Sequence, residues 1–232
     1  MTRPRPLRVV ASVVAVLALT ATAACSTHPG DAAVVGSDHL STSDIDDVAG
    51  ALCAAQGASA QSGQAQQLPS RAARQGALRL LIDARLSASY GDALSVKPDQ
   101  EQIDNAISSQ EQTINAVKGK DRTVLRDTIV DVVKGQLILI EAGRRELVKR
   151  GAPAAQVTGD TALQAGTKLR NDWAAKHVDV SVDPRFGTYK QGGLQGSSGS
   201  LSVPATSRSK AGAAPQPSSS WVSALPAAQK CS

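Results

Sequence analysis

Aromatic side chains are almost absent from this chain of 232 residues, because Phe, Trp and Tyr together make up only 2% of it. A hydrophobic core must therefore be built from Leu, Ile, Val and Ala, and few aromatic anchors remain for a binding surface, where Trp and Tyr are usually enriched. Trp173, Phe186 and Tyr189 are the candidate contacts for a bound polypeptide, but a role as core anchors is the favoured interpretation.

Histidine is also rare, and His28, His39 and His177 are far apart in the sequence. None lies four residues from another metal-ligating side chain, as a zinc site on a helix would require. The chain contains neither a Gly-x-Ser-x-Gly nucleophile motif nor a phosphate-binding loop. We therefore expect a protein that is not an enzyme, that binds no metal or cofactor and that has no small-molecule substrate.

The net charge of +5 does not come from a concentrated basic face. Arg3, Arg5 and Arg8 supply three positive charges at the extreme N-terminus, and acidic and basic residues are mixed elsewhere. Nucleic-acid binding requires clustered Lys and Arg, so the charge pattern argues against it. After the first apolar segment, no run approaches the length of about 20 residues that a membrane-spanning helix needs.

The N-terminus has the features of an export signal. The three arginines precede a short apolar run over 9–19, and small residues then lead to Cys25. The run is too short to span a bilayer well, so the pattern predicts a signal peptide over 1–24 that is cleaved. Export places the mature protein outside the cytoplasm.

A cysteine that directly follows small residues resembles the bacterial lipobox, although Thr22 occupies a position that is usually Leu or Val. The resemblance implies a diacylglyceryl lipid anchor on Cys25, a spacer over 25–31 and a location on the extracytoplasmic face of the cell membrane. The alternative is soluble secretion after a cut at Ala21-Thr22-Ala23.

Cys53 and Cys231 remain once Cys25 carries lipid, and exported compartments permit a disulfide bond between them. Such a bond would close almost the whole mature chain into one loop, worth on the order of 5 kcal/mol in the chain-entropy model. The alternative is two unrelated thiols, one buried in a helix and one in a frayed tail. We favour the disulfide, because exported proteins rarely keep unpaired cysteines.

Hydrophobic periodicity predicts a mainly helical domain over 32–189. The expected helices begin at Ser41, which pairs with Asp44 in a capping box, and then cover 69–89, 98–119, 121–151 and 161–176. The helix over 121–151 is apolar on more than one face and should be central. Short strands over 32–36 and 177–183 should pair with each other. A Gly-, Ser- and Pro-rich tail follows over 190–232, and its segment 192–220 is expected to be flexible.

This order of elements ends in Val178-Asp179-Val180-Ser181-Val182-Asp183-Pro184-Arg185-Phe186-Gly187-Thr188-Tyr189. It resembles the chaperone lobe (the SurA N-terminal domain) of SurA-like and PrsA-like foldases, in a short actinobacterial lipoprotein form. The resemblance covers 32–189 and implies about five helices with a small two-stranded sheet that joins the domain ends. A parvulin isomerase domain is often inserted in that family, but only the loop over 151–160 is available here, so no isomerase activity is expected.

The resemblance implies a membrane-anchored, chaperone-like holdase that binds unfolded or extended exported polypeptides in a shallow helical groove. The alternative is a structural or interaction lipoprotein that binds one dedicated partner in the cell envelope. An open apolar groove would favour the holdase, whereas an evenly polar surface would favour the dedicated partner.

Overall fold

The computed structural model describes residues 29–60, 68–195, 206–214 and 217–231. The predicted signal peptide, Cys25 and His28 lie outside these described residues. Within them the chain is mainly helical with small antiparallel sheets, which confirms the predicted fold class. None of the helices in the described ranges has both the length and the hydrophobicity needed to cross a membrane.

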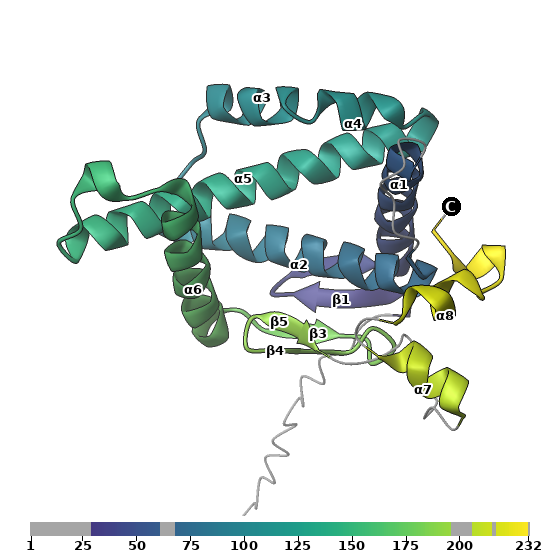
Figure 1. Cartoon of the computed structure of the whole chain (residues 1–232). Helices are drawn as coiled ribbons and strands as arrows, with labels where there is room; N and C mark the ends of the chain where they lie inside the picture. Colours follow the sequence, from purple (N-terminus) through teal and green to yellow (C-terminus); the bar gives the residue numbers. More distant parts are fainter. Residues whose placement is uncertain (1–28, 61–67, 196–205, 215–216, 232) are drawn as a thin grey trace, which may run out of the picture.

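The long helix α5 (Gly119–Lys149) runs through the middle of the molecule, as its apolar faces predict (Figure 1). Helix α2 (Ser70–Leu94) packs on one side of it, and the short helices α3 (Gln100–Ser108) and α4 (Glu111–Ala116) pack on another. Helix α1 (Thr42–Ala60) closes one end against α2 and α5, and α6 (Gly159–His177) closes the other.

The start of α1 follows from the predicted capping box. The Asp44 backbone N–H donates to Ser41 Oγ at 3.1 Å, and the Ser41 N–H donates to Asp44 Oδ2 at 3.0 Å. The single helix predicted over 98–119 is wrong, because the chain turns at Ser109 and Gln110 between α3 and α4. The Ser109 hydroxyl donates to the Ala106 carbonyl at 2.6 Å, and such local bonds compete with a continuous helix.

Two helix starts also differ from the prediction. Pro98 does not begin α3; Asp99 is the residue that caps it, through a bond from the Gln102 N–H at 3.2 Å. Helix α5 begins two residues before Asp121, at Gly119, which has a left-handed φ of 62°.

A three-stranded sheet in the order β2-β1-β3 lies beside α2. The predicted pairing of the domain ends is confirmed, since Val34 of β1 (Asp31–Val35) is opposite Ser181 of β3 (Val180–Val182). Strand β2 (Asp38–Ser41) was not expected, because its sequence contains a single apolar residue, Leu40. Gly36, with φ of 60°, makes the turn that lets β2 fold back on β1.

A second hairpin joins β4 (Thr188–Lys190) to β5 (Gly193–Gln195). Its turn residues Gln191 and Gly192 both have positive φ, at 51° and 77°, as tight hairpin turns require. Helices α7 (Ser207–Ala213) and α8 (Ser219–Ser223) follow. Regular structure therefore continues into the segment that composition predicted to be flexible.

The main hydrophobic core lies between α1, α2 and the three-stranded sheet. Its largest fully buried side chains are those of Ile45, Leu78, Ile82 and Leu86. A smaller cluster joins α3 and α4 to α5 through Ile103, Ile107 and Ile114. The core is mostly aliphatic, as the shortage of aromatic residues predicts, although Phe186 and Tyr90 are also buried.

The C-terminal segment is attached to α1 and α2. Cys53 and Cys231 form the predicted disulfide bond, with their Cα atoms 4.9 Å apart. The Cys231 N–H donates to the Leu68 carbonyl at 2.8 Å, and the Arg71 guanidinium lies 5.3 Å from the centre of the Trp221 ring. These contacts hold the last described residues against the start of α2.

Candidate functional site between helices α2, α5 and α6

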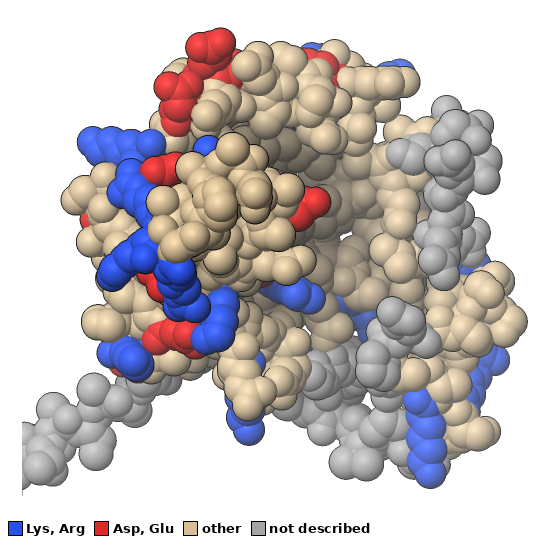
Figure 2. Space-filling model, turned by 60° about the vertical axis from the view of Figure 1, so that its left-hand side comes forward, with Lys and Arg blue, Asp and Glu red and all other residues tan. Residues whose placement is uncertain are grey.

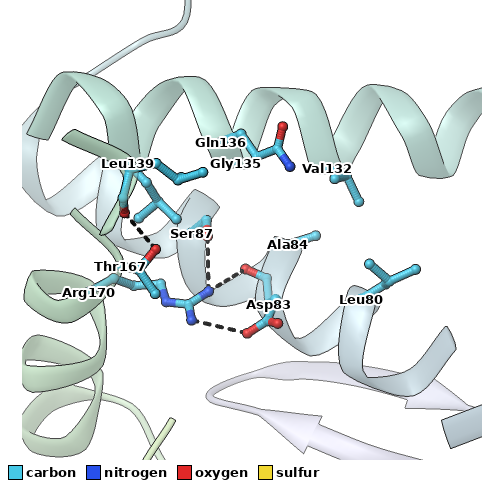
Figure 3. Close-up of a pocket in the computed structure, with 11 residues that line it drawn as sticks. Leu80, Asp83, Ala84, Ser87, Val132, Gly135, Gln136, Leu139, Thr167 and Arg170 are labelled. Carbon is cyan, nitrogen blue, oxygen red and sulfur yellow. Dashed lines mark hydrogen bonds and ion pairs between the residues drawn. The ribbon is translucent and has the colours of Figure 1, made fainter. Parts of the chain in front are cut away.

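A cavity of about 230 Å³ lies where α2, α5 and α6 meet (Figure 3). Each helix contributes residues spaced three or four apart, which places them on one helical face. The lining residues are Leu80, Asp83, Ala84 and Ser87 of α2, Val132, Gly135, Gln136 and Leu139 of α5, and Leu163, Thr167 and Arg170 of α6. The cavity is thus formed by three sequence segments that are far apart in the chain.

Small residues set the spacing of these helices. A Cβ atom added to Gly135 would lie 3.1 Å from the Cβ atom of Ser87, so α2 and α5 approach closely here. At the crossing of α5 and α6, a Cβ atom on Gly166 would lie 1.9 Å from the Leu139 carbonyl oxygen. The close approach at Gly166 brings the cavity-lining face of α6 next to α5.

The polar side of the cavity is built around Arg170, whose side chain is only 4% exposed. Its Nη1 donates to the Asp83 carbonyl and to Ser87 Oγ, both at 3.3 Å (Figure 3). Its Nη2 donates to Asn171 Oδ1 at 2.8 Å and lies 3.1 Å from Asp83 Oδ1, and its Nε donates to Asn171 Oδ1 at 3.1 Å. Protein acceptors therefore engage all three guanidinium nitrogens.

This pairing decides what the cavity can bind. A buried guanidinium without partners would carry a large desolvation cost, and Asp83, Ser87 and Asn171 offset it. Burial raises the pKa of Asp83, while the positive charges of Arg170 and Arg79 oppose that rise. Because the donors of Arg170 are already used, the site offers no free cation to an anionic ligand.

The remaining walls are largely aliphatic, with Leu80, Val132, Leu139 and Leu163 among them. The Thr167 hydroxyl donates to the Leu163 carbonyl at 2.7 Å, so it too is engaged. A dry cavity of about 150 Å³ is large enough for a benzene-sized group, whereas drug-sized ligands usually occupy about 300–1,000 Å³. The size and lining therefore suit one large apolar side chain.

The aromatic residues singled out from the sequence do not line this cavity. Phe186 is buried in the main core, and Trp173 is half-buried between Tyr90 and His177, with ring centroids 5.4 Å from each. Tyr189 is half-buried, and its hydroxyl is buried without a hydrogen-bond partner among the described residues. The interpretation of Trp173 and Phe186 as core anchors fits these positions.

The acidic cluster at the start of α1 has structural roles. Besides the capping by Asp44, Asp46 accepts from Arg74 Nη2 at 2.8 Å, and Asp47 accepts from Lys120 Nζ at 2.7 Å. These ion pairs connect α1 to α2 and α5. In the part of the chain that the structure describes, no group of His, Cys, Asp and Glu could hold a metal ion.

Arg170 is the site residue that sequence reasoning missed. A signal was present, because Arg170 lies seven residues after Leu163 and three before Trp173, on the inward face of α6. A charged residue on an inward face implies a buried partner, but the sequence does not say which acidic residue supplies it. Only the crossing of α2 and α6 in the structure shows that Asp83 is the partner of Arg170.

Few large hydrophobic residues are strongly exposed on the described surface. Leu94 and Val148, each 41% exposed, are the large hydrophobic residues in the exposed class within the described ranges. Figure 2 shows acidic and basic side chains next to one another on the end formed by α5 and α6, in agreement with the ion pairs Arg145–Glu141, Arg150–Glu146 and Lys168–Asp172.

Comparisons of the chain with models of protein families, with curated proteins and with solved structures find no match.

Proposed function

We propose that the protein is a non-enzymatic, lipid-anchored binding protein of the extracytoplasmic space that holds extended polypeptides in the manner of a chaperone holdase. The cavity between α2, α5 and α6 serves as the seat for an apolar side chain. The observation that carries this proposal is a cavity of about 230 Å³ with aliphatic walls, whose buried cation Arg170 is already neutralised by Asp83.

The binding free energy expected for one side chain in this cavity suits transient binding. Burial of a Leu- or Phe-sized side chain contributes about 1.5–3 kcal/mol, which is less than the roughly 4 kcal/mol of a millimolar complex. A client must therefore make further contacts along its chain, and each contact can be released separately. The export signal and Cys25 support this role, because they would place the site at the membrane from which exported chains emerge.

A second candidate is a binding protein for one dedicated envelope partner. The low exposure of large hydrophobic residues favours it, because a general holdase usually presents a wider apolar surface. In this case the cavity would bind one particular side chain of a defined partner.

The test is suppression of aggregation by lipid-free protein starting at Ser26, added to a chemically unfolded substrate during refolding and followed by light scattering. We expect suppression near a one-to-one ratio. The variant Leu80→Asn places an amide in the cavity wall and should require several-fold more protein for the same effect. Leu94→Asn is the matched control, because it makes the same change on the same helix outside the cavity.

Absence of suppression by the wild-type protein at large excess would reject the holdase and favour the dedicated partner. Equal loss in Leu80→Asn and Leu94→Asn would show that the cavity is not the seat. Circular dichroism of both variants identifies any general loss of helix.

A further inference from the structure

The C-terminal segment 184–232 contains no Asp or Glu, because all 20 acidic residues of the chain lie before it. The mixed charge pattern therefore holds only up to Asp183. The cations of the segment are Arg185, Lys190, Arg208, Lys210 and Lys230.

Helices α7 and α8 fold onto the start of α2 through the side chain of Trp221. Its Nε1 donates to the Arg208 carbonyl of α7 at 2.9 Å, and the Arg71 guanidinium of α2 lies 5.3 Å from its ring centre. A Cβ atom added to Gly212 would overlap the Trp221 ring, so α7 rests directly on it. The three helices thus present one basic surface, whose cations are Arg71, Arg208, Lys210 and Lys230.

Within the described residues, no carboxylate neutralises these cations. Arg208 Nη2 donates to the Ala224 carbonyl at 3.1 Å, and Lys230 Nζ donates to the Ser223 carbonyl at 2.7 Å. These carbonyls orient the two side chains but leave their positive charge in place. The Lys210 side chain is exposed, and on the neighbouring helix α1 Asp46 is already paired with Arg74.

The surroundings of the basic surface fit a membrane. Trp221 and Leu225 are half-buried beside the cations, and Trp is enriched at membrane–water interfaces. The spacer 25–31 leads from the predicted lipid anchor to β1, and a chain of that length reaches at most about 20 Å. Because Cys231 packs against the same core as Ala32 of β1, the anchor would hold the C-terminal segment close to the bilayer.

The basic surface is separate from the α2–α5–α6 cavity. Helices α7 and α8 lie at the end of the molecule opposite α6 (Figure 1). Along α2, Arg71 precedes Leu80, the first residue of the cavity lining, by about two helical turns. A partner on the basic surface would therefore leave the cavity open.

We propose that the basic surface docks on the anionic headgroups of a phospholipid bilayer, as a second membrane contact besides the lipid anchor. This inference rests on the membrane location in the proposed function, but not on the holdase activity. Each Lys or Arg near an anionic bilayer contributes about fivefold in affinity. Contact through α7 and α8 would hold α6 and the cavity away from the bilayer, where exported chains can reach them.

Sedimentation with lipid vesicles tests this proposal on the protein from Ser26, which lacks the anchor. The vesicles contain equal amounts of phosphatidylglycerol and phosphatidylcholine, and the control vesicles contain phosphatidylcholine alone. We expect binding to the mixed vesicles at low salt. Binding should be lost at about 1 M salt, where charges are screened beyond about 3 Å.

The double variant Arg208→Gln and Lys210→Gln should bind the mixed vesicles about tenfold or more weakly than the wild type. The matched control, Arg144→Gln with Lys149→Gln, removes the same charges from the far end of α5 and should bind like the wild type. Because Arg208 also bonds to Ala224, the single variant Lys210→Gln tests the charge without removing a described contact. It should bind about fivefold more weakly.

Three results would overturn the proposal: no binding of the wild type to mixed vesicles at low salt, equal binding to phosphatidylcholine alone, or equal losses in the two double variants. Binding to DNA or polyglutamate without binding to vesicles would assign the surface to a soluble polyanion and would overturn it as well. Suppression of aggregation without vesicle binding would leave the proposed holdase standing. Vesicle binding without suppression would leave the basic surface standing and reject the holdase.

Discussion

Two glycines decide how closely α5 and α6 pack. A Cβ atom on Gly143 would lie 1.9 Å from the Ala162 carbonyl oxygen, and one on Gly166 would lie 1.9 Å from that of Leu139. Backbone atoms cannot move aside as a flexible side chain can. Any side chain at these positions must push α6, which carries Arg170, away from α5.

Gly166→Ala should therefore destabilise the protein by about 1–3 kcal/mol, the usual cost of overpacking, although alanine favours helices. Gly76→Ala is the matched control, because Gly76 lies in α2 with no atom within 4 Å of an added Cβ. It should be neutral or stabilising by up to about 1 kcal/mol. Urea unfolding of both variants gives the comparison, and equal midpoints would contradict the predicted close contact.

The turn between β3 and β4 depends on one aspartate. Asp183 accepts from the Arg185 N–H at 2.8 Å and from Arg185 Nη2 at 2.7 Å. Its carbonyl accepts from the N–H of Phe186, which is buried in the main core. The short strands on either side thus rely on a charge-assisted turn.

The hydrogen bonds from Arg185 lower the pKa of Asp183, so the folded state favours the carboxylate. This contribution to stability is present above the unfolded pKa of about 3.9 and is lost as pH falls through the lower folded value. Asp183→Asn should be less stable than the wild type at pH 7, and the difference should be smaller at a pH of about 2, below the unfolded pKa of about 3.9. Thermal unfolding at both pH values measures it, and a difference that does not depend on pH would reject the role of the charge.

At the scale of the whole molecule, the disulfide bond joins the end of the chain to α1. Cys53 and Cys231 are 178 residues apart, so the bond closes a covalent loop that contains the helices α2, α5 and α6 and the cavity between them. The Leu68 hydrogen bond, a bridge between Pro69 and Lys230 and the stacking of Arg71 on Trp221 also attach this segment to the start of α2. The covalent bond adds to these contacts.

Reduction of this bond should lower the free energy of unfolding by about 2–5 kcal/mol, because the unfolded chain regains freedom over a long loop. Urea midpoints of the protein from Ser26, with and without reductant, measure the effect. The double variant Cys53→Ser and Cys231→Ser should match the reduced protein and should not respond to reductant. Identical midpoints for oxidised and reduced wild type would contradict the prediction.

The sequence alone determined the main helices, the cap of α1, the pairing of the two end strands and the disulfide bond. Each of these depends on local chemistry or has very few possible partners. Helical periodicity predicted α1, α2, α5 and α6, and Ser41 with Asp44 predicted the cap of α1. The pairing of β1 with β3 followed from the presence of two apolar strand segments at the ends of a helical block. The disulfide followed from the two cysteines left after Cys25.

Other elements were missed because their local signals are weak. Strand β2 has one apolar residue, and the β4–β5 hairpin is three residues on each side, too short for periodicity to stand out. The polar run at 108–110 is compatible with a helix in sequence terms, but in the structure the chain turns there, and the Ser109 hydroxyl donates to the Ala106 carbonyl. Such outcomes depend on side chain–backbone bonds that compete almost evenly with helix formation.

Only the tertiary structure decided the candidate site. The face that each helix presents could be predicted, but not which faces meet or at what spacing. Gly143 and Gly166 set the distance between α5 and α6 through backbone contacts, and Gly135 lets α2 approach α5 at Ser87. The crossing then brings Arg170 to Asp83.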